Sequence, residues 1–204
     1  MRPRTVEDPQ LLDLLLEAFA DLGYDGTSVR ALCRHLGVSH NMIHQRFQSK
    51  NAAWHAAVEH AFATLNAAMW DPEPEVDPAD PLEAIREVMV RFVDATIAQP
   101  ALARIIHQEA ARPGPRFDHM LTHHIEPVQQ RAIDAFAQLQ DAGLVRSGPV
   151  PAAYFFLSTW GIGGMASSQQ LARRVGFPGD DPVESAYLAV DILISGLRAS
   201  SSSR

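Results

Sequence analysis

The residues best suited to bind a polyanion lie between Asp25 and Glu59, a stretch that contains no acidic residue. It holds four fixed positive charges: Arg30, Arg34, Arg46 and Lys50. The whole chain of 204 residues has a net charge of −7, so this window is positive within an acidic protein. Because affinity for phosphates comes chiefly from Lys and Arg, the window predicts contact with DNA. The alternative is a solvated face that happens to lack acids.

The same stretch has the pattern of a helix-turn-helix over residues 27–47. A short apolar-periodic segment ends at Gly37, which permits a tight turn, and Ser39 can cap the next helix. In such a unit the second helix lies in the major groove and the first crosses the DNA backbone. The second helix then offers side chains to base edges and phosphates: His40, Asn41, Gln45 and, in part, Met42 and His44. The alternative is an ordinary helical hairpin.

Helical periodicity of apolar residues extends along nearly the whole chain, and strand-like alternation is almost absent. We expect an all-α fold of about nine helices. Their expected ranges are 11–22, 28–37, 39–47, 50–70, 82–98, 101–111, 116–142, 151–174 and 181–198. The segment 71–81, rich in proline and acids, is expected to be a loop.

Composition excludes several classes of protein. A single cysteine, Cys33, rules out a disulfide framework and a cysteine-rich zinc module. The polar start lacks the apolar core of a secretory signal, and no apolar run is long enough to span a bilayer. We therefore expect a cytoplasmic protein with no membrane partner. No nucleophile elbow, metalloprotease motif or phosphate loop is present, so we expect neither an enzyme nor a cofactor.

From Leu11 to about Phe62 the chain resembles the DNA-binding domain of the tetracycline-repressor (TetR) family. The matching segments are Phe19-Ala-Asp-Leu-Gly-Tyr24, Gly26-Thr-Ser-Val-Arg30, Leu36-Gly-Val-Ser39 and Arg46-Phe-Gln-Ser-Lys50. The resemblance implies a homodimer with an N-terminal DNA-binding domain, here 1–50, and a helical ligand-binding and dimerisation domain, here 51–204. It implies a regulator, most often a repressor, that binds a palindromic operator and is released by a small-molecule effector.

The resemblance also assigns roles around the helix-turn-helix. It implies that Thr27 and Ser28 hold phosphate at the start of the second helix, close to Arg30, and that Lys50 does so at the start of the fourth. A helix N-terminus suits this role because its N–H groups are free to bind an anion. His44 stands where the family usually has a tyrosine that contacts the DNA backbone.

The effector pocket is expected between the middle helices, and the effector is expected to be largely apolar. Its candidate lining residues are Met89, Phe92, Thr96, Ile106, Glu109, Met120 and Trp160. The alternative for the apolar members is the ordinary core. For Glu109 it is a surface ion pair with Arg112 or Arg116.

The last two helices resemble the pair that forms a four-helix bundle across the dimer axis of the family. Candidate interface residues mix small and bulky side chains: Phe156, Thr159, Gly163, Ser167, Val190, Leu193, Ile194 and Leu197. The alternative is that these residues form the core of a single chain.

Two further patterns have weaker support. His119 and His123 lie four apart on an expected helix, with His124 adjacent, but no acidic third ligand is fixed by spacing, so we expect no metal site. Gly161-Ile-Gly-Gly-Met-Ala166 formally fits a dinucleotide-binding fingerprint, with Asp181 twenty residues after Gly161. That acid should end a second strand, yet it follows a turn, and too few residues remain for a sheet.

Overall fold

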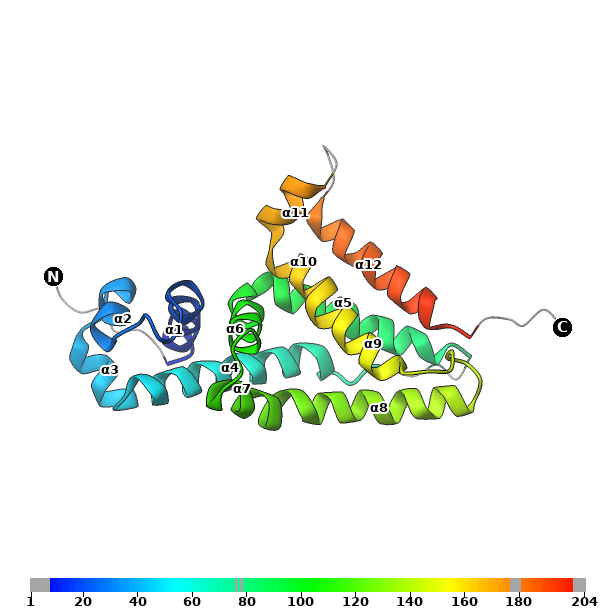
Figure 1. The fold of residues 1–204 in the computed structure, drawn as a ribbon, viewed down its shortest axis with the longest axis horizontal. Coiled ribbons are helices and arrows are strands. Elements are labelled where there is room, and N and C mark those ends of the chain that lie inside the picture. Colours follow the sequence, from blue (N-terminus) through cyan, green and yellow to red (C-terminus); the bar gives the residue numbers. More distant parts are fainter. Residues whose placement is uncertain (1–7, 76, 78, 177–180, 200–204) are drawn as a thin grey trace.

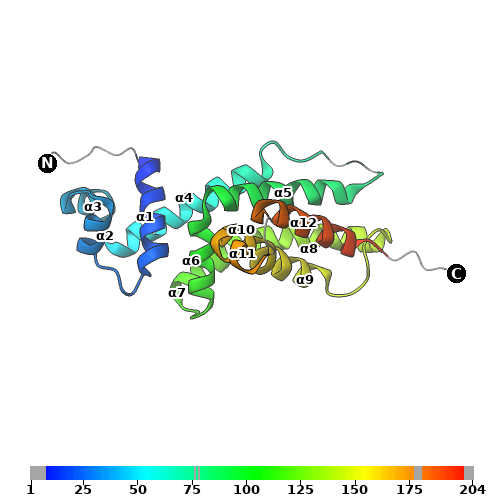
Figure 2. The ribbon, with the colours of Figure 1, turned by 90° about the horizontal axis from the view of Figure 1, so that it is seen from above.

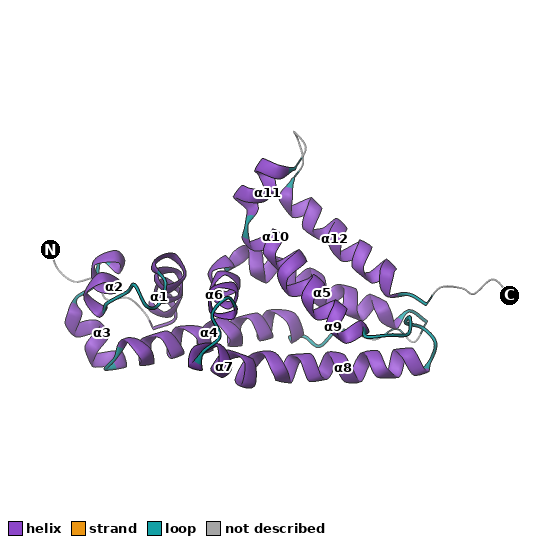
Figure 3. Ribbon diagram, viewed as in Figure 1, coloured by secondary structure: helices purple, strands orange, loops and turns teal. Residues whose placement is uncertain are grey.

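The chain folds into helices joined by short loops, as a computed structural model shows for residues 8–75, 77, 79–176 and 181–199 (Figure 1). These residues include no strand (Figure 3), so the predicted all-α class is confirmed. The helices are α1 (Asp8–Leu22), α2 (Val29–Leu36), α3 (His40–Phe47), α4 (Lys50–Trp70), α5 (Pro81–Ala98), α6 (Pro100–Ala110), α7 (Pro115–Met120), α8 (Glu126–Asp141), α9 (Val150–Phe156), α10 (Gly163–Ser167), α11 (Gln169–Val175) and α12 (Pro182–Leu197).

Several of these segments are continuous. The π-helical segment η1 (Leu121–Ile125) joins α7 to α8, and a second, η2 (Leu157–Ile162), joins α9 to α10. Counted as continuous helices, the described residues form ten, one more than predicted. The extra helix arises because the expected helix over 151–174 breaks at Ser168, whose ψ of 45° is not helical.

Serine caps and one glycine set the limits of the helix-turn-helix. Ser28, Ser39 and Ser49 begin α2, α3 and α4, and each side chain accepts a hydrogen bond of 3.1–3.2 Å from the N–H three residues on. Gly37 ends α2 with a φ of 66°, in the left-handed region that favours glycine. These local interactions agree with the sequence-based expectations for Ser39 and Gly37.

The first of two apolar cores lies where α1, α4 and α6 meet. Leu15 on α1, Trp54 on α4 and Ile105 on α6 are at most 2% exposed and belong to one buried cluster. The amide of Gln108 on α6 also donates a hydrogen bond of 2.7 Å to the carbonyl oxygen of Ala20 on α1. The core beneath the helix-turn-helix therefore includes residues from beyond position 100.

The second core lies between α5, α8, α9–α10 and α12, which run beside one another in Figure 2. Val93, Phe136 and Val190 are at most 1% exposed within it. The long helix α4 links the two parts, because it packs on α1 at one end and on α5 at the other. Within the described ranges, no helix combines the length and apolar character needed to cross a membrane.

Candidate nucleic-acid interface

Helices α2 and α3 form the helix-turn-helix at one end of the molecule (Figure 1). Leu32 on α2, Val38 in the turn and Ile43 on α3 are 0%, 7% and 1% exposed, so packing fixes how the two helices lie together. The opposite face of α3 is exposed at three side chains that can reach DNA: His44, Gln45 and Arg46. This arrangement is able to present one helix to a major groove.

Two predicted phosphate contacts, Thr27 and Lys50, turn inward in the structure. Thr27 is 4% exposed, and its hydroxyl donates a hydrogen bond to the carbonyl oxygen of Gly23. The ammonium of Lys50 donates hydrogen bonds to the carbonyl oxygens of Tyr24 at 3.0 Å and Thr27 at 2.9 Å. Thr27 and Lys50 thus both position the loop before α2, and their contacts with phosphate stay a prediction.

The other predicted DNA contacts fall into three groups. Ser28, Arg30, His44 and Gln45 are exposed, whereas Ser39 and Met42 are half-buried. His40 and Asn41 belong to α3, but their side chains lie outside the described part of the structure, as do Arg2 and Arg4. The exposed residues remain predicted contacts, with Gln45 well placed for base edges.

Tyr24 organises the base of this unit and was missed by sequence reasoning. The ammonium of Lys50 lies 4.0 Å from the centre of its ring, and the guanidinium of Arg116 lies 3.9 Å from it. Its hydroxyl is 3.4 Å from the side-chain oxygen of Asn51. The sequence contained no signal for the Arg116 contact, because that residue comes from α7, far along the chain.

Cys33 has no role at this surface. The residue is 7% exposed on the inner side of α2, and burial raises the pKa of its thiol. The protonated thiol is a core group rather than a nucleophile.

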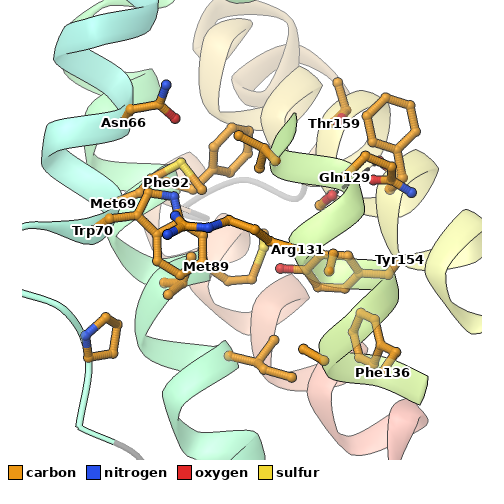
Figure 4. Close-up of a pocket in the computed structure, with 18 of the residues that line it drawn as sticks. Asn66, Met69, Trp70, Met89, Phe92, Gln129, Arg131, Phe136, Tyr154 and Thr159 are labelled. Atoms are coloured by element: carbon orange, nitrogen blue, oxygen red, sulfur yellow. Dashed lines mark hydrogen bonds between the residues drawn. The ribbon is translucent and has the colours of Figure 1, made fainter. Parts of the chain in front are cut away.

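A cavity of about 390 Å³ lies between α4, α5, α8 and the α9–η2 segment. Its wall is mainly apolar, and Figure 4 shows Met89, Phe92 and Phe136 among the residues that line it. A few polar side chains join them: Asn66, Gln129, Arg131, Tyr154 and Thr159. A volume and lining of this kind suit a small apolar molecule with one or two polar groups.

Two polar groups of the cavity have defined surroundings. The guanidinium of Arg131 on α8 lies 5.2 Å from the ring of Trp70 at the end of α4 (Figure 4). Burial raises the pKa of the Tyr154 phenol, which therefore stays neutral and keeps its proton. Arg131 thus offers a cation and Tyr154 a neutral hydroxyl group to an occupant, beside the Glu73 carboxylate and the hydroxyl groups of Ser158 and Thr159.

Of the seven predicted pocket residues, Met89, Phe92 and Ile106 line the cavity. The other four do not, and each has a different environment. Thr96 and Met120 are buried at 5% and 0% exposure. Glu109 accepts a hydrogen bond of 2.8 Å from Nε of Arg116, which is the ion pair that the sequence left open. Trp160 stacks on His107, with the ring centres 5.6 Å apart.

The predicted dimer residues of α12 face the wrong way for an interface. Val190, Leu193, Ile194 and Leu197 are all at most 8% exposed, because they form the second core of the chain. Gly163 is buried against Phe92, Thr159 lines the cavity, and Ser167 donates a hydrogen bond of 3.2 Å to the carbonyl oxygen of Gly164. Among the eight predicted residues, Phe156 alone is exposed, at 60%.

The glycine-rich segment has no dinucleotide-binding geometry. Gly161 to Ala166 lie within the continuous helix η2–α10, so they form neither a strand nor a strand-to-helix turn. A Cβ atom on Gly163 would lie 3.0 Å from Cζ of Phe92, which explains the glycine by close packing. The phosphate-binding alternative is therefore wrong for this segment.

The helix-turn-helix within an all-helical fold defines a DNA-binding transcriptional regulator. Residues 11–56 match the sequence model for bacterial regulatory proteins of the tetR family. The N-terminal part of the chain therefore has the sequence of a tetR-type DNA-binding domain.

Similar proteins agree with this assignment. The chain is 27% identical over 137 residues to YezE of Bacillus subtilis (strain 168), an uncharacterized HTH-type transcriptional regulator; the match covers 66% of this chain and 69% of YezE. A putative fatty acid metabolism regulator of Clostridium perfringens has the same fold, with a TM-score of 0.70 at 17% identity over 92% of this chain and 97% of its own. The ketosteroid transcriptional regulator KstR2 of Mycobacterium tuberculosis gives 0.68 at 20% identity, over 96% and 97%.

Proposed function

We propose that this regulator is a homodimeric repressor that leaves a palindromic operator when an apolar small molecule fills the cavity. The main support is the course of α4, which begins at Lys50 beside the helix-turn-helix and ends at Trp70 on the cavity wall. One helix thus takes part in both sites. An occupant that fits one position of α4 better than another shifts the population toward that position.

The release mechanism follows from the spacing of the two recognition helices in a dimer. Two copies of α3 must reach successive half-sites, whose centres lie about 34–36 Å apart along the DNA. A small movement of α4 changes this separation, because α3 packs against the start of α4. The liganded dimer then no longer matches both half-sites.

The chemistry of the cavity favours an apolar effector with an acidic group. Its wall is largely hydrocarbon, and Arg131 supplies a cation beside the ring of Trp70. The names of the two structural relatives refer to ketosteroid regulation and fatty acid metabolism, which concern molecules of this general character. A long-chain carboxylic acid is therefore a suitable first probe.

The second copy of the chain is proposed to dock on the exposed side of the α9–η2 segment and α12. Five large apolar side chains are between 38% and 64% exposed there: Phe156, Leu157, Trp160, Leu188 and Ile192. The two segments contact each other, so these side chains can form one patch. This patch replaces the buried stripe of α12 as the proposed interface.

The proposal keeps the division into a DNA-binding part, 1–50, and an effector and dimerisation part, 51–204, in a cytoplasmic protein. Selection of bound duplexes from a random library tests it first. An inverted repeat is the expected product. Duplexes recovered without shared sequence would contradict operator binding.

Fluorescence anisotropy then tests release, with a long-chain fatty acid and the alcohol of equal length as matched ligands. The acid should release the selected duplex, and Arg131→Gln should weaken acid binding about tenfold while leaving alcohol binding unchanged. A ligand that fills the cavity without altering DNA affinity would contradict the proposed mechanism.

A further inference from the structure

A cluster of imidazoles surrounds one carboxylate where α4 passes the junction of α7 and η1. Glu59 comes from α4, and His119 and His124 come from the α7–η1 segment. We propose that these three side chains form a binding site for a divalent transition-metal ion, with zinc as the reference case. The site lies apart from the exposed face of α3, and only His124 also reaches the cavity wall.

The distances between the three side chains suit a shared ion. Oε1 of Glu59 lies 2.7 Å from Nε2 of His119 and 3.1 Å from Nε2 of His124. One potential ligand atom from each of the three residues lies within 4.8 Å of the others. Ligand atoms around tetrahedral zinc, each about 2.0–2.1 Å from the ion, are about 3.3 Å apart. Small side-chain rotations therefore suffice to admit an ion.

The π-helical segment η1 explains why His124, rather than His123, belongs to the cluster. The N–H of Glu126 donates to the carbonyl oxygen of Leu121, a bond between residues five apart. This wider turn lets His119 and His124, also five apart, approach the same carboxylate, whereas His123 is exposed. An ordinary α-helix would instead place His119 and His123, four residues apart, on one face. Short π-helical turns often occur at functional sites.

His124 has the features of a preorganised ligand. Its ring stacks on Phe62, with centres 4.3 Å apart and planes 3° from parallel, so its orientation is fixed. Its Nε2 atom is buried and lies 3.1 Å from Oε1 of Glu59, so the imidazole nitrogen already faces the carboxylate with which it would share the ion.

The ligand set also defines the class of ion. Two imidazoles and one carboxylate suit Zn²⁺ and neighbouring transition metals, whereas Mg²⁺ and Ca²⁺ prefer oxygen ligands. The Glu59 side chain is 48% exposed, which leaves a path for the ion and an open position for water. Arg116, a fixed cation on α7, is paired with Glu109 at 2.8 Å, which offsets its repulsion of an ion.

The site would tie α4 to the α7–η1 segment. An ion held by Glu59 on one side and two histidines on the other restricts how α4 moves against the rest of the chain. An effect of the ion on DNA affinity follows from this restriction and rests on the proposed function. Binding of the ion does not depend on the proposed function, so ion binding and its effect on DNA affinity are measured separately.

Titration of the full, tag-free chain with Co²⁺ and Zn²⁺ tests the site after removal of metal with a chelator. Co²⁺ should produce the visible absorption of a four- or five-coordinate ion, saturate at one ion per chain and be displaced by Zn²⁺. Glu59→Gln, His119→Gln and His124→Gln should each weaken binding on the order of 100-fold. Circular dichroism of each metal-free variant checks that it is folded.

Two matched variants remove histidines that the proposal leaves out. His123→Gln removes the adjacent exposed imidazole, and His60→Gln removes one whose Nε2 lies 3.4 Å from Asp13. Both should bind Co²⁺ like the natural chain. Absence of saturable binding, or equal losses for His123→Gln and His124→Gln, would overturn the proposal. If a histidine variant does not fold, Glu59→Gln still tests the metal site, because replacing a half-exposed side chain should leave the fold intact.

Discussion

The ammonium nitrogen of Lys50 lies 2.9 Å from the carbonyl oxygen of Thr27. The first residue of α4 thereby closes the loop that leads into α2, with a second hydrogen bond to Tyr24 at 3.0 Å. Its positive charge sits between the starts of two helices, where N–H groups also favour an anion. Lys50 thus has two roles: it stabilises the loop before α2, and it adds a positive charge to the predicted DNA-binding surface.

Replacement of Lys50 should therefore affect both stability and DNA affinity. Lys50→Met keeps the aliphatic stem but removes the charge and both hydrogen bonds, so we expect a loss of about 1–2 kcal/mol in the free energy of unfolding. Urea denaturation measures this loss. DNA affinity should fall for all sequences, with a shallower dependence on salt. Arg34→Met removes an exposed charge from α2 and should leave the free energy of unfolding unchanged. If the Lys50→Met and Arg34→Met variants were equally stable, Lys50 would not stabilise the loop before α2.

Gln45 is expected to read base edges rather than phosphates. Its side chain is exposed on the outer face of α3, and Gln45→Ala should weaken binding to the selected operator by about 1–3 kcal/mol. Binding to a scrambled duplex should change little. Anisotropy titrations with both duplexes compare the two effects. Gln130→Ala on α8 serves as the control, and an equal loss on both duplexes would reassign Gln45 to backbone contact.

The proposed dimer patch predicts a monomer when a charge is placed within it. Ile192 is 64% exposed in the single chain, so Ile192→Glu should leave the fold intact. Within a dimer the same change buries an unpaired charge, which should raise the dissociation constant on the order of 100-fold. Sedimentation equilibrium measures this constant. Ile133→Glu, at a 38% exposed position of α8, should remain dimeric.

Two neighbouring glycines provide a matched test of packing beside the cavity. In Gly163→Ala the new methyl carbon would lie 3.0 Å from Cζ of Phe92, which should cost about 1–3 kcal/mol of stability. Gly161 has no atom within 4 Å of the corresponding position, so Gly161→Ala should be neutral or stabilise the helix by up to about 1 kcal/mol. Thermal unfolding compares the two variants. Equal midpoints would show that Phe92 moves aside freely.

Local rules predicted the helix-turn-helix well. Ser39 and Gly37 act through atoms a few residues away, so their roles are visible in the sequence. The buried stripe of α12 misled the dimer prediction, because periodicity marks the apolar face of a helix without saying which partner covers it. Similarly, the pairing of Glu59 with His124 depends on the π-helical turn and on a separation of 65 residues, which sequence spacing does not encode.

The first core has a consequence for protein engineering. Leu102, Ile105 and Met120 are buried with the side chains of α1 and α4, at 5%, 2% and 0% exposure. A fragment that stops at residue 50, or even at the end of α4, would expose this shared apolar surface to water. The DNA-binding end is thus not a transplantable module: a chimera that grafts it onto another sensor must carry the chain through Met120, or supply matching side chains from the new host.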